Sequence, residues 1–184
     1  GCIYAPSIRR HPEPITAKCE GTLNNWHAYL LEKNFETIII FSRYTASLER
    51  SLFNNTIGGI EYSTLNINRD KMPPYVAITD KTNPPIPLSR DAFVDYLRHD
   101  LNELAQLSKN FILIYPVPEV GWHPYELALT KARFGEDTAI KTPYSVFVER
   151  NKYTYAALDS VSGENIIRVK PADFICDSGY CNTR

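Results

Sequence analysis

The sequence predicts a layered α/β fold in which helices cover both faces of a mainly parallel sheet. Three apolar, β-branched runs, at residues 37–41, 111–115 and 166–169, have the length and composition of strands buried on both faces. Segments with the apolar spacing of helices separate these runs, and this alternation is typical of α/β proteins. At 184 residues and 43% hydrophobic content, the chain can form one domain with a sizeable core.

The amino-terminal half contains one helix and one strand between irregular segments. Residues 1–20 are rich in proline and are expected to be loop-like, whereas apolar spacing over residues 21–33 predicts a helix. The strand at residues 37–41 follows, and Asn-Asn-Thr-Ile-Gly-Gly at residues 54–59 has the composition of a turn. Five prolines within residues 66–88 predict an irregular excursion, because no long helix can cross it.

The second half alternates helices and strands more regularly. Ser89 is expected to be the N-cap of a helix that runs to about Lys109 and precedes the strand at residues 111–115. Pro124 is a favourable first residue for a further helix, which should end near Gly135. The remaining predictions are a helix from Thr142 to about Val161 and the strand at residues 166–169.

Composition narrows the function classes. The net charge of −1 gives no indication of a nucleic-acid partner. No apolar run reaches the 18 or so residues that a membrane span needs. Because the chain begins with Gly1 and not with methionine, it is expected to be a processed, excised or engineered portion of a protein.

The four cysteines form one pair near each end of the chain. Cys2 and Cys19 lie near the start, and Cys176 and Cys181 near the end. Three pairings are possible, and local pairing within each group is the simplest. Zinc binding and free thiols are the alternatives, but neither pair has the spacing typical of zinc ligands and no metal is expected. Two disulfides would indicate an oxidising compartment such as the periplasm or the cell exterior.

Candidate binding residues follow two of the predicted strands. Arg43 and Tyr44 come after residues 37–41, and Glu119, Trp122 and His123 come after residues 111–115. Parallel sheets bind ligands beyond the carboxyl ends of their strands, so these side chains are expected to line a cleft. Each also has an ordinary interpretation: a solvated arginine, a turn acid, a packed tryptophan, or a histidine that caps a helix.

A complete hydrolytic triad is not recognisable. Asp177-Ser178-Gly179 superficially resembles a nucleophile motif, but a short loop between Cys176 and Cys181 needs small turn residues. No histidine follows it, and no Asp-x-x-His occurs in the chain. Nucleophilic catalysis by serine requires a neighbouring base and a group that orients this base.

Several segments in order resemble the SGNH domains that are fused to family 3 membrane acyltransferases. They are IIIFSRYTASLERSLFNNTIGGIE, then IPLSRDAFVDYLRHDLNELAQLSKNFILIYPVPEVGW, then TPYSVFVERN, LDSV and IIRVKPADFIC with the last cysteine. The resemblance spans nearly all of residues 2–181. It implies a three-layer α/β/α sandwich of the SGNH-hydrolase type and a single domain over residues 1–184.

The resemblance also implies a function. Such a domain is expected on the periplasmic side of an inner-membrane protein, where it helps to O-acylate, usually O-acetylate, a surface polysaccharide such as lipopolysaccharide O-antigen. The expected partners are the polysaccharide acceptor and the acyltransferase membrane domain of the same polypeptide, and no cofactor is expected. The alternatives are a non-catalytic glycan-binding or scaffold relative and an unrelated secreted α/β domain.

The chain departs from the family pattern at its catalytic blocks. The family nucleophile lies in a Gly-Asp-Ser block and its Asp and His in an Asp-x-x-His block, and neither occurs here. The chain is therefore expected to be an incomplete portion of the domain, without a known catalytic residue. The oxyanion-binding Asn of the wider superfamily is also missing after residue 41, so Arg43 or nearby backbone N–H groups would have to replace it.

A structural consequence follows for the sheet. The missing nucleophile strand is expected centrally, beside the strands that hold residues 38–40 and 112–114. Its absence should leave unpaired backbone groups in mid-sheet, where they are costly. We therefore expect a segment of the same polypeptide or a strand from another chain to complete the sheet.

Overall fold

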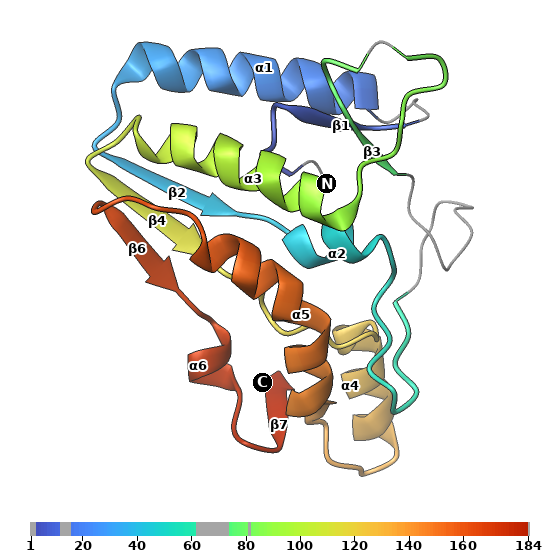
Figure 1. Cartoon of the computed structure of the whole chain (residues 1–184). Helices are drawn as coiled ribbons and strands as arrows, with labels where there is room; N and C mark the ends of the chain where they lie inside the picture. Colours follow the sequence, from blue (N-terminus) through green and yellow to red (C-terminus); the bar gives the residue numbers. More distant parts are fainter. Residues whose placement is uncertain (1–2, 12–15, 62–73, 81, 184) are drawn as a thin grey trace.

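The computed structural model describes residues 3–11, 16–61, 74–80 and 82–183 of the chain (Figure 1). The helices are α1 Thr16–Lys33, α2 Tyr44–Glu49, α3 Arg90–Ala105, α4 Pro124–Arg133, α5 Tyr144–Asp159 and α6 Ala172–Ile175. The strands are β1 Ile8–Arg10, β2 Thr37–Phe41, β3 Tyr75–Ala77, β4 Asn110–Ile114, β5 Ile140–Pro143, β6 Ile166–Val169 and β7 Tyr180–Thr183.

The three predicted apolar strands form one parallel sheet in the order β2-β4-β6. Ile39 of β2 pairs with Ile112 of β4, which pairs in turn with Ile167 of β6. Helical segments connect these strands along the chain, as parallel pairing requires. The predicted α/β class with a parallel sheet is confirmed.

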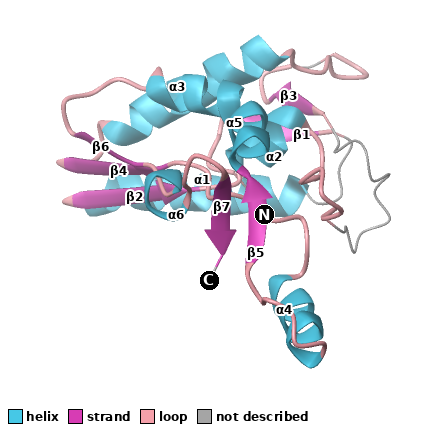
Figure 2. Cartoon of the chain, turned by 90° about the horizontal axis from the view of Figure 1, so that it is seen from below, coloured by secondary structure: helices cyan, strands magenta, loops and turns pink. Residues whose placement is uncertain are grey.

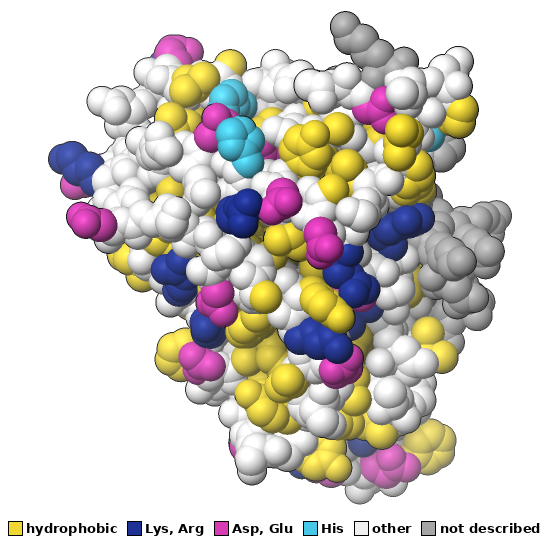
Figure 3. All heavy atoms as spheres, in the orientation of Figure 1, with side chains coloured by type: hydrophobic (Ala, Val, Ile, Leu, Met, Phe, Trp, Pro, Cys, Tyr) yellow, Lys and Arg dark blue, Asp and Glu magenta, His cyan; other side chains and the backbone are white. Residues whose placement is uncertain are grey.

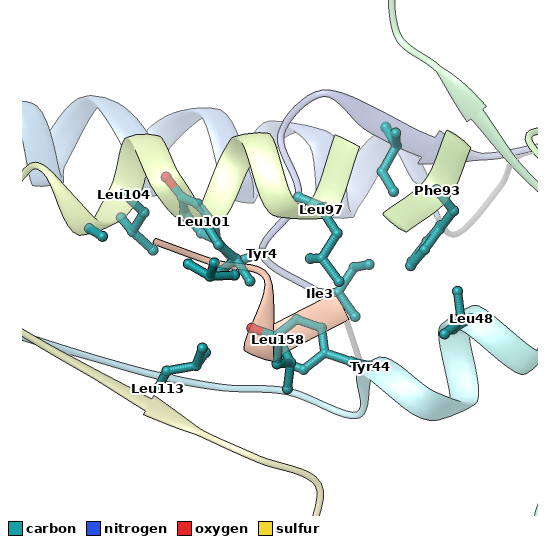
Figure 4. Packing of buried hydrophobic residues seen from close by; sticks show 14 of the residues in the cluster. Ile3, Tyr4, Tyr44, Leu48, Phe93, Leu97, Leu101, Leu104, Leu113 and Leu158 are labelled. Atoms are coloured by element: carbon teal, nitrogen blue, oxygen red, sulfur yellow. The ribbon is translucent and has the colours of Figure 1, made fainter. Parts of the chain in front are cut away.

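One face of the sheet packs against α1 and α3, which lie on the same side of it in Figure 1. Phe111 and Leu113 of β4 point into this core and are fully buried. Figure 4 shows Leu97, Leu101 and Leu104 of α3 lying above Leu113, as the four-residue and three-residue spacing of a helix stripe demands. The apolar stripe of α3 therefore packs into the core.

The opposite face of the sheet is apolar but open among the described residues. Ile39, Phe41 and Ile167 are 61%, 53% and 50% exposed, whereas Ile38 on the other face of β2 is buried. Seen from below in Figure 2, most of β2 and β4 has no helix in front of it. Strands of this composition are normally covered on both faces, so the described part of the chain leaves one apolar sheet face without a cover.

The expected gap in mid-sheet is absent. β2 and β4 pair directly along five residues each, from Thr37 with Asn110 to Phe41 with Ile114. The expectation of unpaired backbone in mid-sheet was wrong, because no strand separates β2 from β4. That a further segment completes the sheet at an outer edge stays a prediction. Within the described ranges, the outer edges of β2 and of β6 have no strand beside them.

The start of α1 and several short strands were not predicted from the sequence. α1 begins at Thr16, five residues before the predicted start, inside a segment that was expected to be loop-like. Two antiparallel pairs, β1 with β3 and β5 with β7, were not predicted. Their strands have three or four residues and occur in proline-rich or polar sequence, so no period-two pattern can develop.

Helix boundaries were predicted more successfully than short strands. Ser89 caps α3, and its hydroxyl oxygen accepts a hydrogen bond from the backbone N–H of Ala92 at 3.2 Å. Pro124 is the first residue of α4, as expected. The helix predicted from Thr142 begins at Tyr144, because Thr142 and Pro143 belong to β5.

The carboxyl-terminal cysteine prediction is confirmed. Cys176 and Cys181 form a disulfide that ties the end of α6 to β7. The second predicted disulfide lies outside the description: Cys2 is not among the described residues, and neither is the side chain of Cys19.

The surface mixes charges of both signs. On the face in Figure 3, basic and acidic side chains are interspersed with apolar ones over α3 and α5. Several of these charges form exposed pairs within one helix, such as Arg98 with Asp95 and Lys152 with Glu149. A polyanion such as nucleic acid needs a basic stripe, and this face offers none.

Candidate functional site

The candidate site lies at the carboxyl edge of the sheet, where β2 and β4 end side by side. The chain leaves β2 at Phe41 and passes through Ser42 and Arg43 before α2 begins. It leaves β4 at Ile114 and runs through Pro116-Val117-Pro118 without regular structure. Because proline lacks an N–H and cannot continue a central strand, these prolines end β4 at the point where the site begins.

A pocket of about 600 Å³ occupies this edge. It is lined by Phe41, Ser42, Arg43, Thr45, Ala46, Phe53, Glu61, Pro116, Val117, Pro118, Glu119, Val120, Gly121, Trp122, His123 and Pro124. Four of the five residues that the sequence singled out, Arg43, Glu119, Trp122 and His123, are therefore brought together. The volume is in the range of small-molecule sites in proteins.

Arg43 is the centre of an ion-pair network in the pocket. Its Nη1 donates to Glu61 Oε1 at 2.6 Å and its Nη2 to Glu61 Oε2 at 2.9 Å. Nη2 also donates to Glu119 Oε1. The two-pronged geometry with Glu61 is the strong form of an arginine–carboxylate pair, so three segments of the chain are tied together by one guanidinium.

Arg150 of α5 pairs with Glu119 but does not itself line the pocket. Its Nε donates to Glu119 Oε2 at 3.1 Å, while Nη1 and Nη2 donate to the hydroxyl and carbonyl oxygens of Ser51 at 2.7 and 2.9 Å. The side chain of Arg150 is only 11% exposed, against 54% for Arg43. Arg150 therefore anchors the network to the body of the protein, and Arg43 is the member that a ligand can reach.

The network shifts the pKa values of its members. The hydrogen bond with Glu61 raises the pKa of Arg43, and this effect exceeds the lowering that burial causes. Burial alone would raise the pKa of Glu61, but hydrogen bonds from Arg43 and from the backbone N–H of Phe53 outweigh it and lower the pKa. Both groups are therefore held in their charged forms.

The Asn-Asn-Thr-Ile-Gly-Gly turn forms one wall of the site. Asn55 Oδ1 accepts hydrogen bonds from the N–H groups of Ile57 and Gly59 at 3.0 and 2.7 Å, and Nδ2 donates to the carbonyl of Val120 at 2.9 Å. A Cβ on Gly59 would lie 2.7 Å from Trp122. Glycine at this position lets the turn pack against the tryptophan.

Tyr44 does not line the pocket. It was expected in the cleft, but its ring is fully buried in the core, with Leu48 and Leu158 in the same cluster. The side chain of a residue that starts a helix can turn back into the core, and α2 places Tyr44 in this way. Its hydroxyl forms no hydrogen bond with any described residue, and burial raises its pKa.

Asp177-Ser178-Gly179 has the ordinary role considered above, whereas His123 lines the pocket. His123 is exposed at the N-cap position of α4, and its side chain makes no capping hydrogen bond. Asp177 Oδ1 accepts hydrogen bonds from the N–H groups of Gly179 and Tyr180 at 2.8 and 2.7 Å. The triplet is therefore a turn that Asp177 stabilises inside the disulfide loop.

One group of side chains on α3 has the spacing of metal ligands. Donor atoms of His99, Asp100 and Glu103 on α3 lie within 4.8 Å of one another. Asp100 is already engaged, because its two oxygens accept hydrogen bonds from the N–H and the hydroxyl of Ser7. Its role in the described structure is to hold the amino-terminal segment against α3.

Two members of the network escaped sequence analysis. Glu61 ends the segment that carries the Gly-Gly turn, and Arg150 lies in the middle of α5. The turn before Glu61 was a usable signal, because it returns the chain toward the end of β2. Arg150 had none, since an arginine within a helix is indistinguishable in sequence from a solvated one.

The fold and the pocket define an α/β domain with a candidate site at the carboxyl edge of a parallel sheet. The chain belongs to the family described as "SGNH domain (fused to AT3 domains)", which matches it over residues 1–184. The resemblance seen in the sequence is confirmed, and the chain is a domain of an acyltransferase-associated type. Comparisons with curated proteins and with solved structures gave no significant match.

None of the described helices combines the length and the apolar character that crossing a bilayer requires.

Proposed function

We propose that this domain takes part in the transfer of an acyl group, most simply acetyl, to a hydroxyl of a surface polysaccharide such as lipopolysaccharide O-antigen. The proposal rests on membership of a family whose SGNH domains are fused to AT3 domains. The observation that carries it is a reachable arginine, Arg43, inside a pocket at the carboxyl edge of the sheet.

Arg43 has donors left for a ligand. Glu61 and Glu119 engage Nη1 once and Nη2 twice, so the Nε–H and one N–H of Nη1 donate to no described residue. When a hydroxyl oxygen attacks an ester carbonyl, negative charge develops on the carbonyl oxygen. Donors aimed at this oxygen stabilise the transition state, and Arg43 would supply them in place of the missing Asn.

The nucleophile and its base are proposed to come from elsewhere in the protein. The Gly-Asp-Ser and Asp-x-x-His blocks of the family do not occur in residues 1–184. A further strand could pair with the outer edge of β2. A further segment could also pack on the open apolar face that contains Ile39 and Phe41. We propose that a further segment of the same polypeptide completes the sheet there and brings the catalytic groups to Arg43.

The periplasm is the proposed location. Disulfides persist in oxidising compartments and are rare in the cytosol, and the Cys176–Cys181 bridge agrees with the former. The proposed partners are the polysaccharide acceptor and the AT3 membrane domain of the same polypeptide.

The test is Arg43→Ala in the complete protein, with acyl incorporation into the polysaccharide as the measurement. We expect a loss of roughly 10²-fold or more in rate, the typical cost of removing one oxyanion donor, measured under conditions in which the variant remains folded despite the lost ion pairs. Arg98→Ala on the surface of α3 is the matched control and should retain full activity. Full activity of Arg43→Ala would refute the proposal, and glycan binding without any acyl transfer in the wild type would favour a non-catalytic role.

A further inference from the structure

The charged groups at the pocket cancel one another. Arg43, Glu61 and Glu119 line it, and Arg150 pairs with Glu119 from behind. Two guanidiniums thus face two carboxylates. No lysine is among the described residues that line the pocket, so the charges of the arginines and carboxylates described there sum to zero.

An anion that enters this pocket would approach Arg43 next to two carboxylates, those of Glu61 and Glu119. Glu61 occupies two nitrogens of Arg43, and Glu119 shares one of them. Glu61 and Glu119 are 25% and 18% exposed, so water screens them less than it screens surface acids. A phosphate or carboxylate that accepts from the remaining N–H groups of Arg43 is therefore repelled by both acids, which already neutralise this cation.

An uncharged, hydroxyl-bearing ligand meets no such penalty. The ionised carboxylates of Glu61 and Glu119 are acceptors with spare lone pairs, which suit hydroxyl donors. The two free N–H groups of Arg43 suit a neutral carbonyl or ring oxygen. Phe41, Phe53 and Trp122 add apolar surface, and sugar rings present apolar C–H faces to such surfaces.

We infer that Glu61 and Glu119 make this pocket selective for an uncharged sugar or sugar ester and exclude acidic or phosphorylated ligands. This inference rests on the proposed function, since it concerns the same site, and it names the class of acceptor. Glu61 and Glu119 act as specificity-determining residues because their negative charges offset the positive charge of Arg43. A pocket built to hold an anion would leave such an arginine without carboxylate partners.

The test compares two probes that differ at one carbon, methyl β-D-glucopyranoside and methyl β-D-glucuronide. Their binding to the complete protein is measured by ligand-observed NMR at pH 8, where histidine imidazoles are ordinarily neutral. We expect the neutral glycoside to bind at least about tenfold more tightly, a difference of about 1.4 kcal/mol. Equal or tighter binding of the glucuronide, or no measurable binding of the glucoside, would overturn the inference.

A charge-removing variant sharpens the test. Glu61→Gln leaves Arg43 with one carboxylate partner, so the preference for the glucoside should fall by about tenfold. Glu32→Gln, on the exposed surface of α1, is the matched control and should leave the preference unchanged. An unchanged preference in Glu61→Gln, in a variant that remains folded under the assay conditions, would also contradict the inference.

The two proposals can fail separately. If Arg43→Ala abolishes acyl transfer but the wild type binds both probes equally, the proposed function stands and the charge selectivity does not. If the wild type prefers the glucoside but acyl transfer does not depend on Arg43, the selectivity stands and the role of Arg43 in transfer does not.

Discussion

Arg43 and Glu119 form an ion pair across the pocket although 76 residues separate them in the chain. They meet because β2 and β4 are neighbouring parallel strands whose carboxyl ends lie at one edge of the sheet. Glu61 and Arg150 complete the network from a turn and from a helix. The pocket is therefore a junction of four segments, and its integrity can be tested at the points where they touch.

The first prediction concerns the contact between Gly121 and Gly59. Gly121 has a φ of +74°, and a Cβ there would lie 2.7 Å from the backbone carbon of Gly59. Gly121→Ala should lower the free energy of unfolding by about 2–3 kcal/mol, through backbone strain and the clash together. Chemical denaturation of wild type and variant measures this difference.

Gly135 provides the matched control. Its φ of +70° is nearly the same, but a Cβ there would have no neighbour within 4 Å. Gly135→Ala should therefore cost about 1 kcal/mol from the left-handed conformation alone. If the two variants lose the same stability, the close approach of the two loops does not exist in solution.

The second prediction concerns two buried tyrosines in the core. Tyr44 and Tyr115 are both fully buried, but Tyr115 donates a hydrogen bond to Asp159 at 2.6 Å, whereas the Tyr44 hydroxyl has no described partner. A buried hydroxyl without a partner costs about 1–3 kcal/mol. Tyr44→Phe should therefore raise the free energy of unfolding by about 1 kcal/mol.

Tyr115→Phe should have the opposite sign and lower the free energy of unfolding by about 1–2 kcal/mol, because it removes a hydrogen bond to a carboxylate. Thermal unfolding of the two variants side by side is the measurement. A loss of stability in Tyr44→Phe would indicate that the hydroxyl is hydrogen-bonded after all, for example to a buried water.

The sequence predicted the sheet and one side of the site for physical reasons. Residues 37–41 and 111–115 were recognisable because they are apolar runs of strand length, and parallel strands end at a common edge. Arg43 and Glu119 follow these strands directly, so their meeting could be expected. The same argument predicted that Trp122 and His123 line the pocket, because they follow the strand at residues 111–115.

The remaining features depend on tertiary contacts that no local pattern carries. Arg150 was missed because its partners, Ser51 and Glu119, lie far away in the chain. Tyr44 was misplaced because adjacency to Arg43 does not determine which way a side chain points at the start of α2. β5 and β7 escaped because four-residue strands with Lys141 or Asn182 at their centres have no apolar alternation.

The third prediction concerns the Cys176–Cys181 disulfide. The bridge closes a loop of five residues' separation and holds β7 beside β5. In the chain-entropy account a loop of this length stabilises the fold by roughly 2 kcal/mol. The double variant Cys176→Ser, Cys181→Ser should lose about this much, as measured by denaturation in the absence of reductant.

Reduction offers an independent comparison for the same bridge. Dithiothreitol should lower the stability of the wild type, and the double serine variant, which lacks this bridge, should show a smaller effect. An equal effect of dithiothreitol on both proteins would mean that the Cys176–Cys181 bridge contributes nothing measurable to stability.

The last prediction uses the pH dependence of the Arg43–Glu61 pair. The pKa of Glu61 lies below its usual value of 4.5 in the folded protein, whereas the unfolded chain restores the usual value. As the pH falls through this interval, the unfolded state binds a proton before the folded state does. The stabilisation from Glu61 is therefore complete above about pH 5.5 and decreases as the pH falls toward and below 4.

A comparison of the wild type with Glu61→Gln isolates this contribution. The difference in unfolding free energy between them should be constant from pH 7 to about 5.5 and should shrink by pH 3. Glu32→Gln, whose exposed carboxylate pairs with Lys33, should show little change over the same range. A difference between wild type and Glu61→Gln that stays constant down to pH 3 would contradict the ion pair, and with it the charge balance from which the ligand selectivity of the pocket was inferred.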